Sequence, residues 1–160
     1  MTQRTGIGID VHPLVEGREL VLGGVVIPFE KGLDGNSDAD VLIHAVIDAM
    51  LGAAALGDIG THFPPGDERY LGIASGVLLT ETQKMLKAAL WRVEYVDATI
   101  LAERPILRPF MPQMKLSMAK LLGLSEDSLN LKATTTDGLG FIGRGEGISC
   151  TAVATITRIE

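Results

Sequence analysis

Apolar and polar residues alternate along residues 7–12, where isoleucine or valine occupies every second position. A period of two predicts a β-strand, because successive side chains of a strand point to opposite faces of the sheet. We expect the apolar side chain of Val11 to turn into the core. The second face of the same strand then carries Asp10 and His12 side by side.

Further strands are predicted by short apolar runs that are bounded by turn residues. Residues 20–22 and 25–27 flank Gly23 and Gly24, which can supply the positive φ angles of a tight turn, so this segment predicts a hairpin. A loop is expected at residues 31–36. The last three strands are predicted at residues 93–101, 129–133 and 148–159.

Three segments place apolar residues at the spacing of a helix. The first begins at Ser37, a residue type common at helix N-caps, with Asp40 three positions later as a capping-box partner, and it continues through His44. The second covers residues 75–90 and the third covers residues 112–123. This order of strands and helices predicts an α+β fold, with a mixed sheet covered by helices on one face.

A chain of 160 residues is long enough for one domain, and we expect a single domain over residues 1–160. Hydrophobic residues make up 46% of the chain and charged residues 21%, which is typical of a folded globular domain rather than a disordered chain. The mean hydropathy of +0.28 is high for a small monomer. It indicates either apolar surface buried between subunits or a core rich in alanine and glycine.

Charge and cysteine content indicate which binding partners and which cellular compartment to expect. The net charge is −6 and the basic residues are scattered, which argues against nucleic-acid binding. Cys150 is the one cysteine, so no intrachain disulfide can form, and we expect it in the core rather than in catalysis. No apolar stretch approaches the length of a membrane helix or a signal core, so we expect a cytoplasmic protein without membrane contact.

Asp10, His12 and His44 form the sharpest candidate site. Asp10 and His12 share a strand face, and His44 lies in the first predicted helix, which could pack over that strand. One carboxylate and two imidazoles suit zinc, with a fourth position left for water or substrate. Asp40 and Asp48, one turn before and after His44, could orient its ring. The alternative is a strand-end aspartate with two unconnected histidines.

Three further segments could bind anions or metal ions, but each could equally have only a structural role. Residues 36–38 precede a predicted helix, where free N–H groups attract anions, but simple capping explains them as well. Residues 134–137 offer hydroxyls and a carboxylate for phosphate and Mg²⁺, or form a threonine-rich strand end. Arg144 lies in a glycine-rich stretch and could bind an anion or pair with Glu146. His62 is expected to be a loop histidine rather than a ligand.

Taken together, these segments resemble the 2-C-methyl-D-erythritol 2,4-cyclodiphosphate synthase family of the non-mevalonate isoprenoid pathway. The resemblance covers essentially the whole chain, in order and at matching spacing. It is carried by residues 8–12 (GIDVH), 22–24 (LGG), 37–44 (SDADVLIH), 52–60 (GAAALGDIG) and 132–147 (KATTTDGLGFIGRGEG).

The resemblance implies a homotrimer with active sites between subunits, and an isoprenoid diphosphate could occupy the three-fold axis. It implies zinc, or another divalent metal, at Asp10, His12 and His44, and Mg²⁺ or Mn²⁺ with the substrate diphosphate. The implied substrate is 4-diphosphocytidyl-2-C-methyl-D-erythritol 2-phosphate, a small cytidine diphosphate compound. Its 2-phosphate attacks the β-phosphorus, CMP leaves and a cyclic diphosphate forms. The implied enzyme is therefore a phosphorus–oxygen lyase, and cations must offset the charge of the two phosphates.

The same matching implies roles for individual residues. Asn36 and Thr135 are expected to stabilise the transition state, and Asp137 to meet the magnesium ion. Further substrate contacts are expected from Asp10, His12, Ser37, Asp58, Ile59, Gly60, Phe63, Ala102, Pro105, Ile106, Leu107, Arg108, Thr134, Thr136, Phe141 and Arg144.

These contacts fall into three groups. Residues 58–60 and Phe63 would line the erythritol side, and residues 102–108 with Thr134 would form the cytidine pocket. Phe141 and Arg144 would lie near the substrate or the three-fold axis.

Four positions depart from the family pattern. Asn36 stands where the family usually has histidine, and it can donate a hydrogen bond but cannot carry a positive charge. Asp137 is one methylene shorter than the usual glutamate. Pro65 replaces an acid found in some members, and Ile106 stands where lysine or arginine is common.

These departures keep two alternatives to the synthase open. The first is a catalytically weakened trimer that binds isoprenoid diphosphates, which Asn36 and Ile106 would explain. The second, a zinc hydrolase of small phosphate esters, has less support because no general base is obvious beside the metal ligands.

Overall fold

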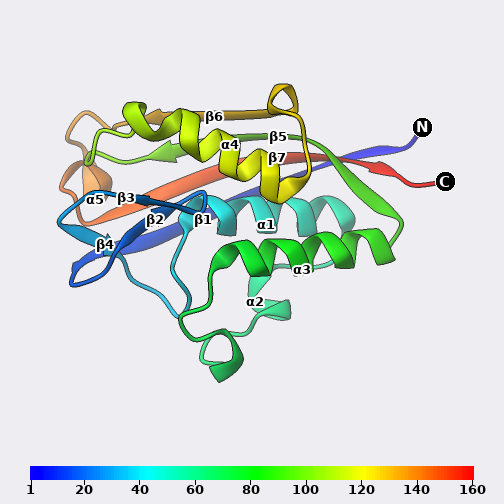
Figure 1. The fold of residues 1–160 in the computed structure, drawn as a ribbon, viewed down its shortest axis with the longest axis horizontal. Helices are drawn as coiled ribbons and strands as arrows, with labels where there is room; N and C mark the ends of the chain where they lie inside the picture. Colours follow the sequence, from blue (N-terminus) through cyan, green and yellow to red (C-terminus); the bar gives the residue numbers. More distant parts are fainter.

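Two long strands from opposite ends of the chain lie side by side at the centre of the sheet in the computed structural model, which describes residues 1–160 (Figure 1). β1 (Gln3–Glu16) pairs antiparallel with β7 (Gly147–Arg158). β5 (Trp91–Leu101) pairs antiparallel with β7 and parallel with β6 (Leu129–Thr134). The short strand β4 (Lys31–Leu33), in a segment expected to be a loop, extends the other edge, giving the order β4-β1-β7-β5-β6. The predicted mixed sheet is confirmed.

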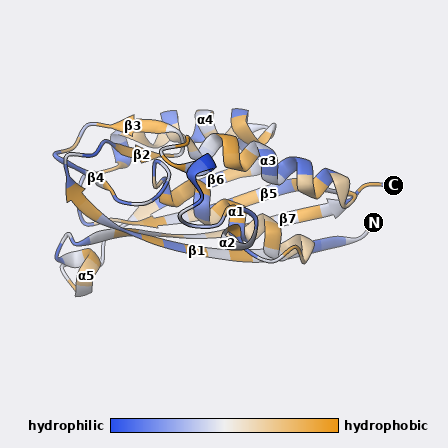
Figure 2. Ribbon diagram, turned by 90° about the horizontal axis from the view of Figure 1, so that it is seen from below, coloured by the Kyte–Doolittle hydropathy of each residue, from blue (hydrophilic) through white to orange (hydrophobic).

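Helices cover one face of this sheet, as predicted (Figure 2). The main helices are α1 (Val41–Ala54), α3 (Ser75–Ala88) and α4 (Met111–Leu122), and the predicted hairpin forms a separate two-stranded sheet of β2 (Leu20–Leu22) and β3 (Val25–Ile27). The short elements are α2 (Ile59–His62), α5 (Gly140–Gly143) and the 3₁₀ turns η1 (Glu68–Tyr70), η2 (Arg108–Phe110) and η3 (Glu126–Ser128).

One continuous apolar cluster of 36 buried residues lies between the sheet and the helices. Cys150 belongs to it, which confirms the expectation of a core cysteine. Burial among apolar side chains raises the pKa of the Cys150 thiol well above its usual range. None of the helices combines the length and the apolar character that a membrane crossing requires.

Close packing of β1 against α1 brings the candidate metal ligands together. A Cβ atom added to Gly8 would lie 1.9 Å from the carbonyl oxygen of Ala45, and one added to Gly6 would lie 2.2 Å from that of Ala49. Only glycine therefore allows this approach of the strand backbone to the helix. Asp10 and His12 continue the same strand face and consequently lie beside His44 of α1.

The apolar face of β1 points away from the core, contrary to the prediction. Ile7, Ile9 and Val11 are 63%, 60% and 45% exposed, on the face opposite α1. The glycine face must turn to α1, because any side chain there would collide with the helix, and the alternation of the strand then directs the isoleucines outward. In the single chain, apolar side chains therefore lie on a sheet face that the main helices leave open (Figure 2).

The start of α1 also differs from the prediction. Asp40, rather than Ser37, is the N-cap, and its carboxylate accepts a hydrogen bond from the N–H of Ile43 at 3.1 Å. It also accepts hydrogen bonds from the N–H groups of Gly23 and Gly24, at 2.9 and 2.7 Å, so it links the hairpin turn to the helix. These three N–H donors satisfy the hydrogen-bonding capacity of the buried Asp40 carboxylate. Residues 36–38 precede the helix and do not cap it.

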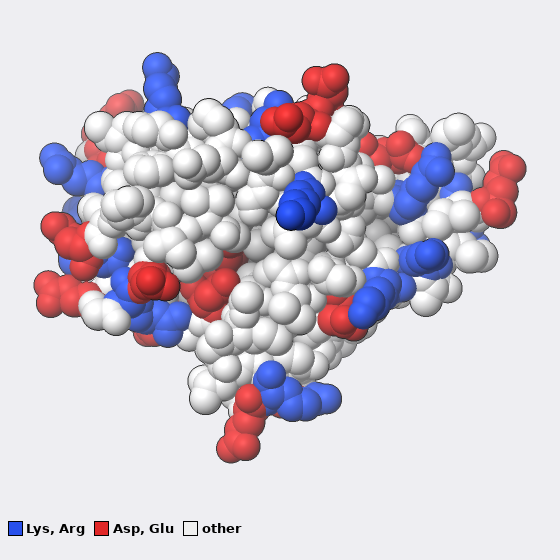
Figure 3. All heavy atoms as spheres, in the orientation of Figure 1, with Lys and Arg blue, Asp and Glu red and all other residues white.

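Acidic and basic side chains are interspersed on the surface that Figure 3 shows. Several acidic and basic residues of the chain form ion pairs, such as Lys132 with Asp97 at 2.6 Å between β6 and β5. This pair holds the pKa of Asp97 below its usual range.

Candidate metal centre and substrate cavities

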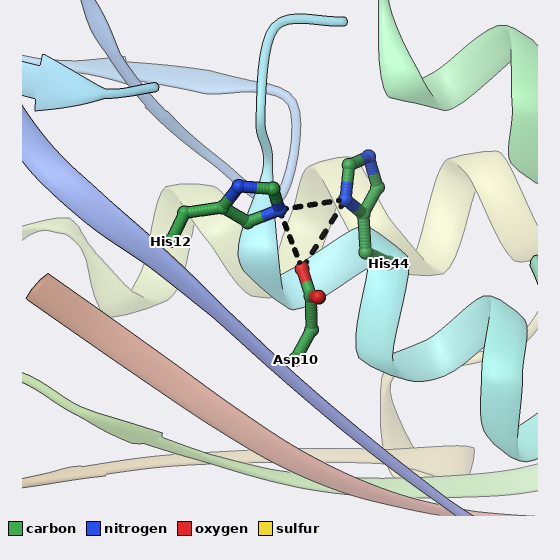
Figure 4. A group of neighbouring side chains, drawn as sticks. All are labelled: Asp10, His12 and His44. Carbon is green, nitrogen blue, oxygen red and sulfur yellow. Dashed lines mark hydrogen bonds and ion pairs between the residues drawn. The ribbon is translucent and has the colours of Figure 1, made fainter. Parts of the chain in front are cut away.

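The side chains of Asp10, His12 and His44 converge on one point between β1 and α1 (Figure 4). His12 Nε2 lies 2.8 Å and His44 Nδ1 lies 3.2 Å from Asp10 Oδ2. The two nitrogens are 3.2 Å apart. The sequence predicted this cluster, and the structure brings all three residues together.

In each imidazole, the nitrogen that points away from the cluster forms hydrogen bonds with other protein groups. His12 Nδ1 lies 2.8 Å from the carbonyl oxygen of Asp34, an acceptor, so it carries the proton of the neutral ring and leaves Nε2 free as a ligand. His44 Nε2 lies 2.8 Å from Ser75 Oγ and 3.2 Å from Ser37 Oγ. Both rings are therefore held with one nitrogen directed at the common point, as metal-binding histidines usually are.

Asp40 and Asp48 do not orient His44, contrary to the prediction. Asp40 is used at the start of α1, and the Asp48 carboxylate accepts a hydrogen bond from the N–H of Ile59 at 2.7 Å. Asp48 lies one helical turn from His44, but the first residue of α2 supplies its hydrogen-bond donor. Burial raises the pKa of Asp48.

Electrostatics within the cluster favour a carboxylate beside imidazoles. Burial alone would raise the pKa of Asp10, but hydrogen bonds and charge attraction from His12 and His44 outweigh it and lower that pKa. Burial alone would lower the pKa of His12, and Asp10 reverses the effect and raises it. Asp10 is thus held as a carboxylate beside the two imidazoles, and one carboxylate with two imidazoles suits a divalent cation.

A cavity of about 220 Å³ opens beside the cluster. Asn36 lines it together with the three cluster residues, so the position that departs from the family pattern lies beside the metal ligands. The other residues that line it are Ser37, Ile59, Gly60, Phe63, Pro65, Tyr70 and Leu78. The Phe63 ring packs edge-on against Tyr70, with centroids 5.3 Å apart.

A larger cavity, of about 500 Å³, lies between the end of β6 and the loop that follows β5. It gathers most of the residues expected around the cytidine, although Arg104 does not line it. Its lining residues are Ala102, Glu103, Pro105, Ile106, Leu107, Arg108, Met111, Leu131, Lys132, Ala133, Thr134 and Thr135. The two cavities share no lining residue, so one chain by itself keeps the metal cluster and this pocket in separate places.

The remaining predicted residues line neither of these cavities. Asp58 caps α2 through a hydrogen bond from the N–H of Thr61 at 2.9 Å. Asp137 has a positive φ of 53° in the turn after β6, where its N–H donates to Thr135 Oγ1 at 3.2 Å. Thr136 donates to the carbonyl oxygen of Leu139 at 2.6 Å.

The exposed end of the glycine-rich stretch holds Phe141 and Arg144. Phe141 is exposed in α5, and Arg144 Nε lies 2.8 Å from Glu146 Oε2. The ion pair that the sequence left as one of two possibilities is therefore present. A third hollow, between this stretch and the β5–α4 loop, is lined by both Arg144 and Arg104.

Ser75 and Tyr70 are site residues that the sequence analysis missed, and Asp38 was considered there only as part of a possible anion site or helix cap at residues 36–38. Ser75 and Asp38 lie behind His44, and Tyr70 lines the cavity beside the cluster. From the sequence, Ser75 could be identified only as the first residue of a helix. Its contact with His44 joins residues that are far apart in the chain. No local spacing signals such a contact.

The fold and the cluster define an α+β protein with a candidate metal centre between a strand and a helix. The chain belongs to the YgbB family, whose sequence profile matches residues 3–157.

Named relatives extend over almost the whole chain. The 2-C-methyl-D-erythritol 2,4-cyclodiphosphate synthase of Alkaliphilus metalliredigens is 54% identical over 153 residues, which are 96% of each chain. That of Moorella thermoacetica is 56% identical over 150 residues, which are 94% of this chain and 92% of the relative.

Solved structures share the fold. A 2C-methyl-D-erythritol-2,4-cyclodiphosphate synthase in a form bound to CDP superimposes with a TM-score of 0.89 at 34% identity, over 96% of this chain and all of that one. The bifunctional IspDF from Campylobacter jejuni has a TM-score of 0.95 at 38% identity, over 99% of this chain. The chain spans 43% of that longer protein.

Proposed function

We propose that the chain is a lyase that converts 4-diphosphocytidyl-2-C-methyl-D-erythritol 2-phosphate to 2-C-methyl-D-erythritol 2,4-cyclodiphosphate and CMP. The observation that carries this proposal is an intact Asp10, His12 and His44 cluster beside a cavity, in a chain 54% identical over nearly its full length to a synthase of that name. The reaction makes a precursor of isoprenoids by the non-mevalonate route.

The metal of the cluster is proposed to be zinc. A tetrahedral zinc with ligand bonds of about 2.0–2.1 Å holds its ligand atoms about 3.3 Å apart. The three ligand atoms here are 2.8 to 3.2 Å apart, so the site would open by only a few tenths of an ångström. When bound, the cation would supply positive charge to a substrate phosphate.

The chain itself is proposed to position the substrate rather than to attack it. The nucleophile is the 2-phosphate of the substrate, which attacks the β-phosphorus while CMP leaves with the bond electrons. Asn36, in the cavity beside the cluster, would donate a hydrogen bond to a phosphate oxygen, and Thr135 would do the same from the larger cavity. Such donors act by preorganised electrostatics.

A second divalent cation, Mg²⁺ or Mn²⁺, would bind with the substrate diphosphate near Asp137. Asp137 is exposed in the turn after Thr135, and its carboxylate accepts a hydrogen bond from Thr135 Oγ1 at 3.4 Å. The cytidine is proposed to enter the cavity of about 500 Å³, with Ala102, Pro105 to Arg108 and Thr134 around it. Residues 58–60 and Phe63 would contact the erythritol.

A homotrimer is proposed because one chain separates its two cavities and leaves apolar sheet surface exposed. Ile7, Ile9 and Val11 would be buried between subunits, and each complete site would combine the metal cluster of one subunit with the cytidine pocket of a neighbour. Phe141 and Arg144 would lie near the three-fold axis, where an isoprenoid diphosphate could bind.

Release of CMP tests the proposed function. The chain, loaded with zinc and given Mg²⁺, is incubated with the cytidine substrate, and CMP and the cyclic product are measured. Equal amounts of both are expected, and His44→Ala, which removes one metal ligand, serves as the matched control. No CMP from metal-loaded protein would overturn the synthase and favour the weakened trimer that binds isoprenoid diphosphates. A linear phosphate product would favour a zinc hydrolase.

A further inference from the structure

The buried Ser75 and the partly buried Asp38 lie behind His44, on the side away from the other metal ligands. Ser75, the first residue of α3, is fully buried, and its Oγ lies 2.8 Å from His44 Nε2. The Ser75 hydroxyl donates a short hydrogen bond to Asp38 Oδ1, and the Ser75 N–H donates to Asp38 Oδ2 at 3.0 Å. Asp38, Ser75 and His44 thus form a continuous hydrogen-bonded row, which we call the Asp38–Ser75–His44 row.

The protons of this row can be accounted for one by one. An ionised carboxylate only accepts hydrogen bonds, and Asp38 already accepts one from the N–H of Asp40 at 3.1 Å and one from the N–H of Ser75. A serine hydroxyl has a single proton, and Asp38 is its nearer partner. Ser75 Oγ can therefore meet His44 only as an acceptor, so the proton between them belongs to His44 Nε2.

The position of this proton decides what His44 presents to the cluster. In a neutral imidazole one nitrogen carries a proton and the other a lone pair. With the proton on Nε2, the lone pair is on Nδ1, which lies 3.2 Å from both Asp10 Oδ2 and His12 Nε2. The opposite tautomer would direct an N–H at the point where the ligand atoms converge, and would leave no proton between Nε2 and Ser75.

Ser37 is a weaker candidate for the same task. Its Oγ lies 3.2 Å from His44 Nε2 and accepts a hydrogen bond from the N–H of Ala39 at 3.2 Å. It has no carboxylate behind it that would fix the direction of its own proton, and it lies 3.5 Å from Ser75 Oγ. His12 is held by a main-chain carbonyl instead, so Ser75 is the partner that a substitution can remove.

We propose that Ser75, oriented by Asp38, is a positioning residue that fixes the Nε2–H tautomer of His44 and so keeps Nδ1 as a metal ligand. The row joins the start of α3 to the loop before α1, so it also fixes the ring against rotation. The proposal rests on the proposed function only in that the cluster binds a divalent metal. Partners of this kind typically contribute 10- to 100-fold in metal affinity.

Zinc affinity of the whole chain, measured by competition with a chromophoric chelator in the absence of substrate, tests the row. Ser75→Ala is expected to weaken zinc binding about 10- to 100-fold, because the Nε2–H loses its acceptor. Ser37→Ala is the matched control and should change the affinity less than threefold. Ser75→Thr keeps a hydroxyl and should restore most of the affinity. Wild-type affinity in Ser75→Ala, or an equal loss in Ser37→Ala, would overturn the proposal.

A second measurement needs no variant and so does not depend on whether Ser75→Ala folds. Nitrogen-15 NMR of the histidine rings in the wild-type chain reports which nitrogen carries the proton. We expect the Nε2–H form of His44 with and without zinc, and a dominant Nδ1–H form without zinc would contradict the row. Because neither experiment uses the cytidine substrate, absence of CMP release would count against the proposed function and not against the row.

Discussion

At the scale of single residues, the cluster predicts which substitutions release the metal. His12→Ala and His44→Ala each remove one of three ligand atoms, and each variant is expected to lose most of its bound zinc. Elemental analysis of the purified protein after dialysis measures the loss. His62→Ala is the control, because His62 Nε2 lies 2.6 Å from the carbonyl oxygen of Leu56 and takes no part in the cluster. Full zinc occupancy in both cluster variants would rule out the site.

Asn36 carries a second prediction at this scale. A neutral amide donates a weaker hydrogen bond to a phosphate than a cationic imidazole does, by about 1 kcal/mol. Asn36→His is therefore expected to raise the rate of CMP release roughly five- to tenfold. The comparison is made at saturating substrate, with zinc content measured in both proteins. An unchanged or lower rate would mean that another group already supplies the charge.

Residues beside the cluster show where local spacing misleads. Asp48 lies one helical turn from His44 and was expected to orient it, yet it accepts the N–H of Ile59. Ser75 orients His44 instead, although nothing in its local sequence indicates this contact. Spacing along a helix predicts which residues share a face, but it does not predict which donor another segment brings to that face.

At the scale of elements, the contact between β1 and α1 depends on glycine. Gly8→Ala is expected to destabilise the chain by about 3 kcal/mol or more, because the added methyl group would collide with the helix backbone at Ala45. Zinc binding at the proposed site should be weakened as well, since the strand and the helix would have to separate. Thermal unfolding of the metal-free chain and its zinc affinity measure the two effects.

Gly52→Ala is the matched control for this contact. Gly52 lies in α1, and an added Cβ would lie 3.9 Å from the carbonyl oxygen of Ile7, its nearest contact outside the helix. Alanine favours a helix over glycine by up to about 1 kcal/mol, so this variant should be as stable as the wild type or more so. Destabilisation of both variants by similar amounts would show that steric contact is not the cause.

The elements themselves were largely predictable. The helices α3 and α4, the hairpin and the strands β5, β6 and β7 lie where apolar periodicity and turn residues predict them. The start of α1 was misplaced because Ser37 and Asp40 are both good N-cap types. In the structure Asp40 is the N-cap, because its carboxylate also accepts hydrogen bonds from Gly23 and Gly24 in the hairpin turn.

At the scale of the whole molecule, the open sheet face predicts assembly. Ile9→Asp places a charge among Ile7, Val11 and their neighbours, and should convert the proposed trimer to monomers because an unpaired charge is costly to bury. CMP release should fall with the trimer, while zinc binding should persist because one chain supplies all three ligands. Light scattering after size-exclusion chromatography gives the mass.

Val26→Asp is the control for assembly. Val26 is 55% exposed on the hairpin, away from the open sheet face, so its replacement should leave the mass and the activity unchanged. A wild-type chain that is monomeric at the concentration of the activity assay, and still active, would contradict the shared sites.

The sequence by itself indicated the order of the main elements, the sheet-and-helix architecture and the three residues of the candidate metal centre, because these follow from periodicity, turn chemistry, residue type and the family resemblance. Tertiary structure alone decided which face of β1 is buried. Ile7, Ile9 and Val11 have the apolar pattern of a core strand, but α1 packs so closely that only Gly6 and Gly8 can face it. A two-residue period shows which residues share a face of the strand, and only the close approach of α1 decides which of the two faces is buried. That selection puts Asp10 and His12 beside His44.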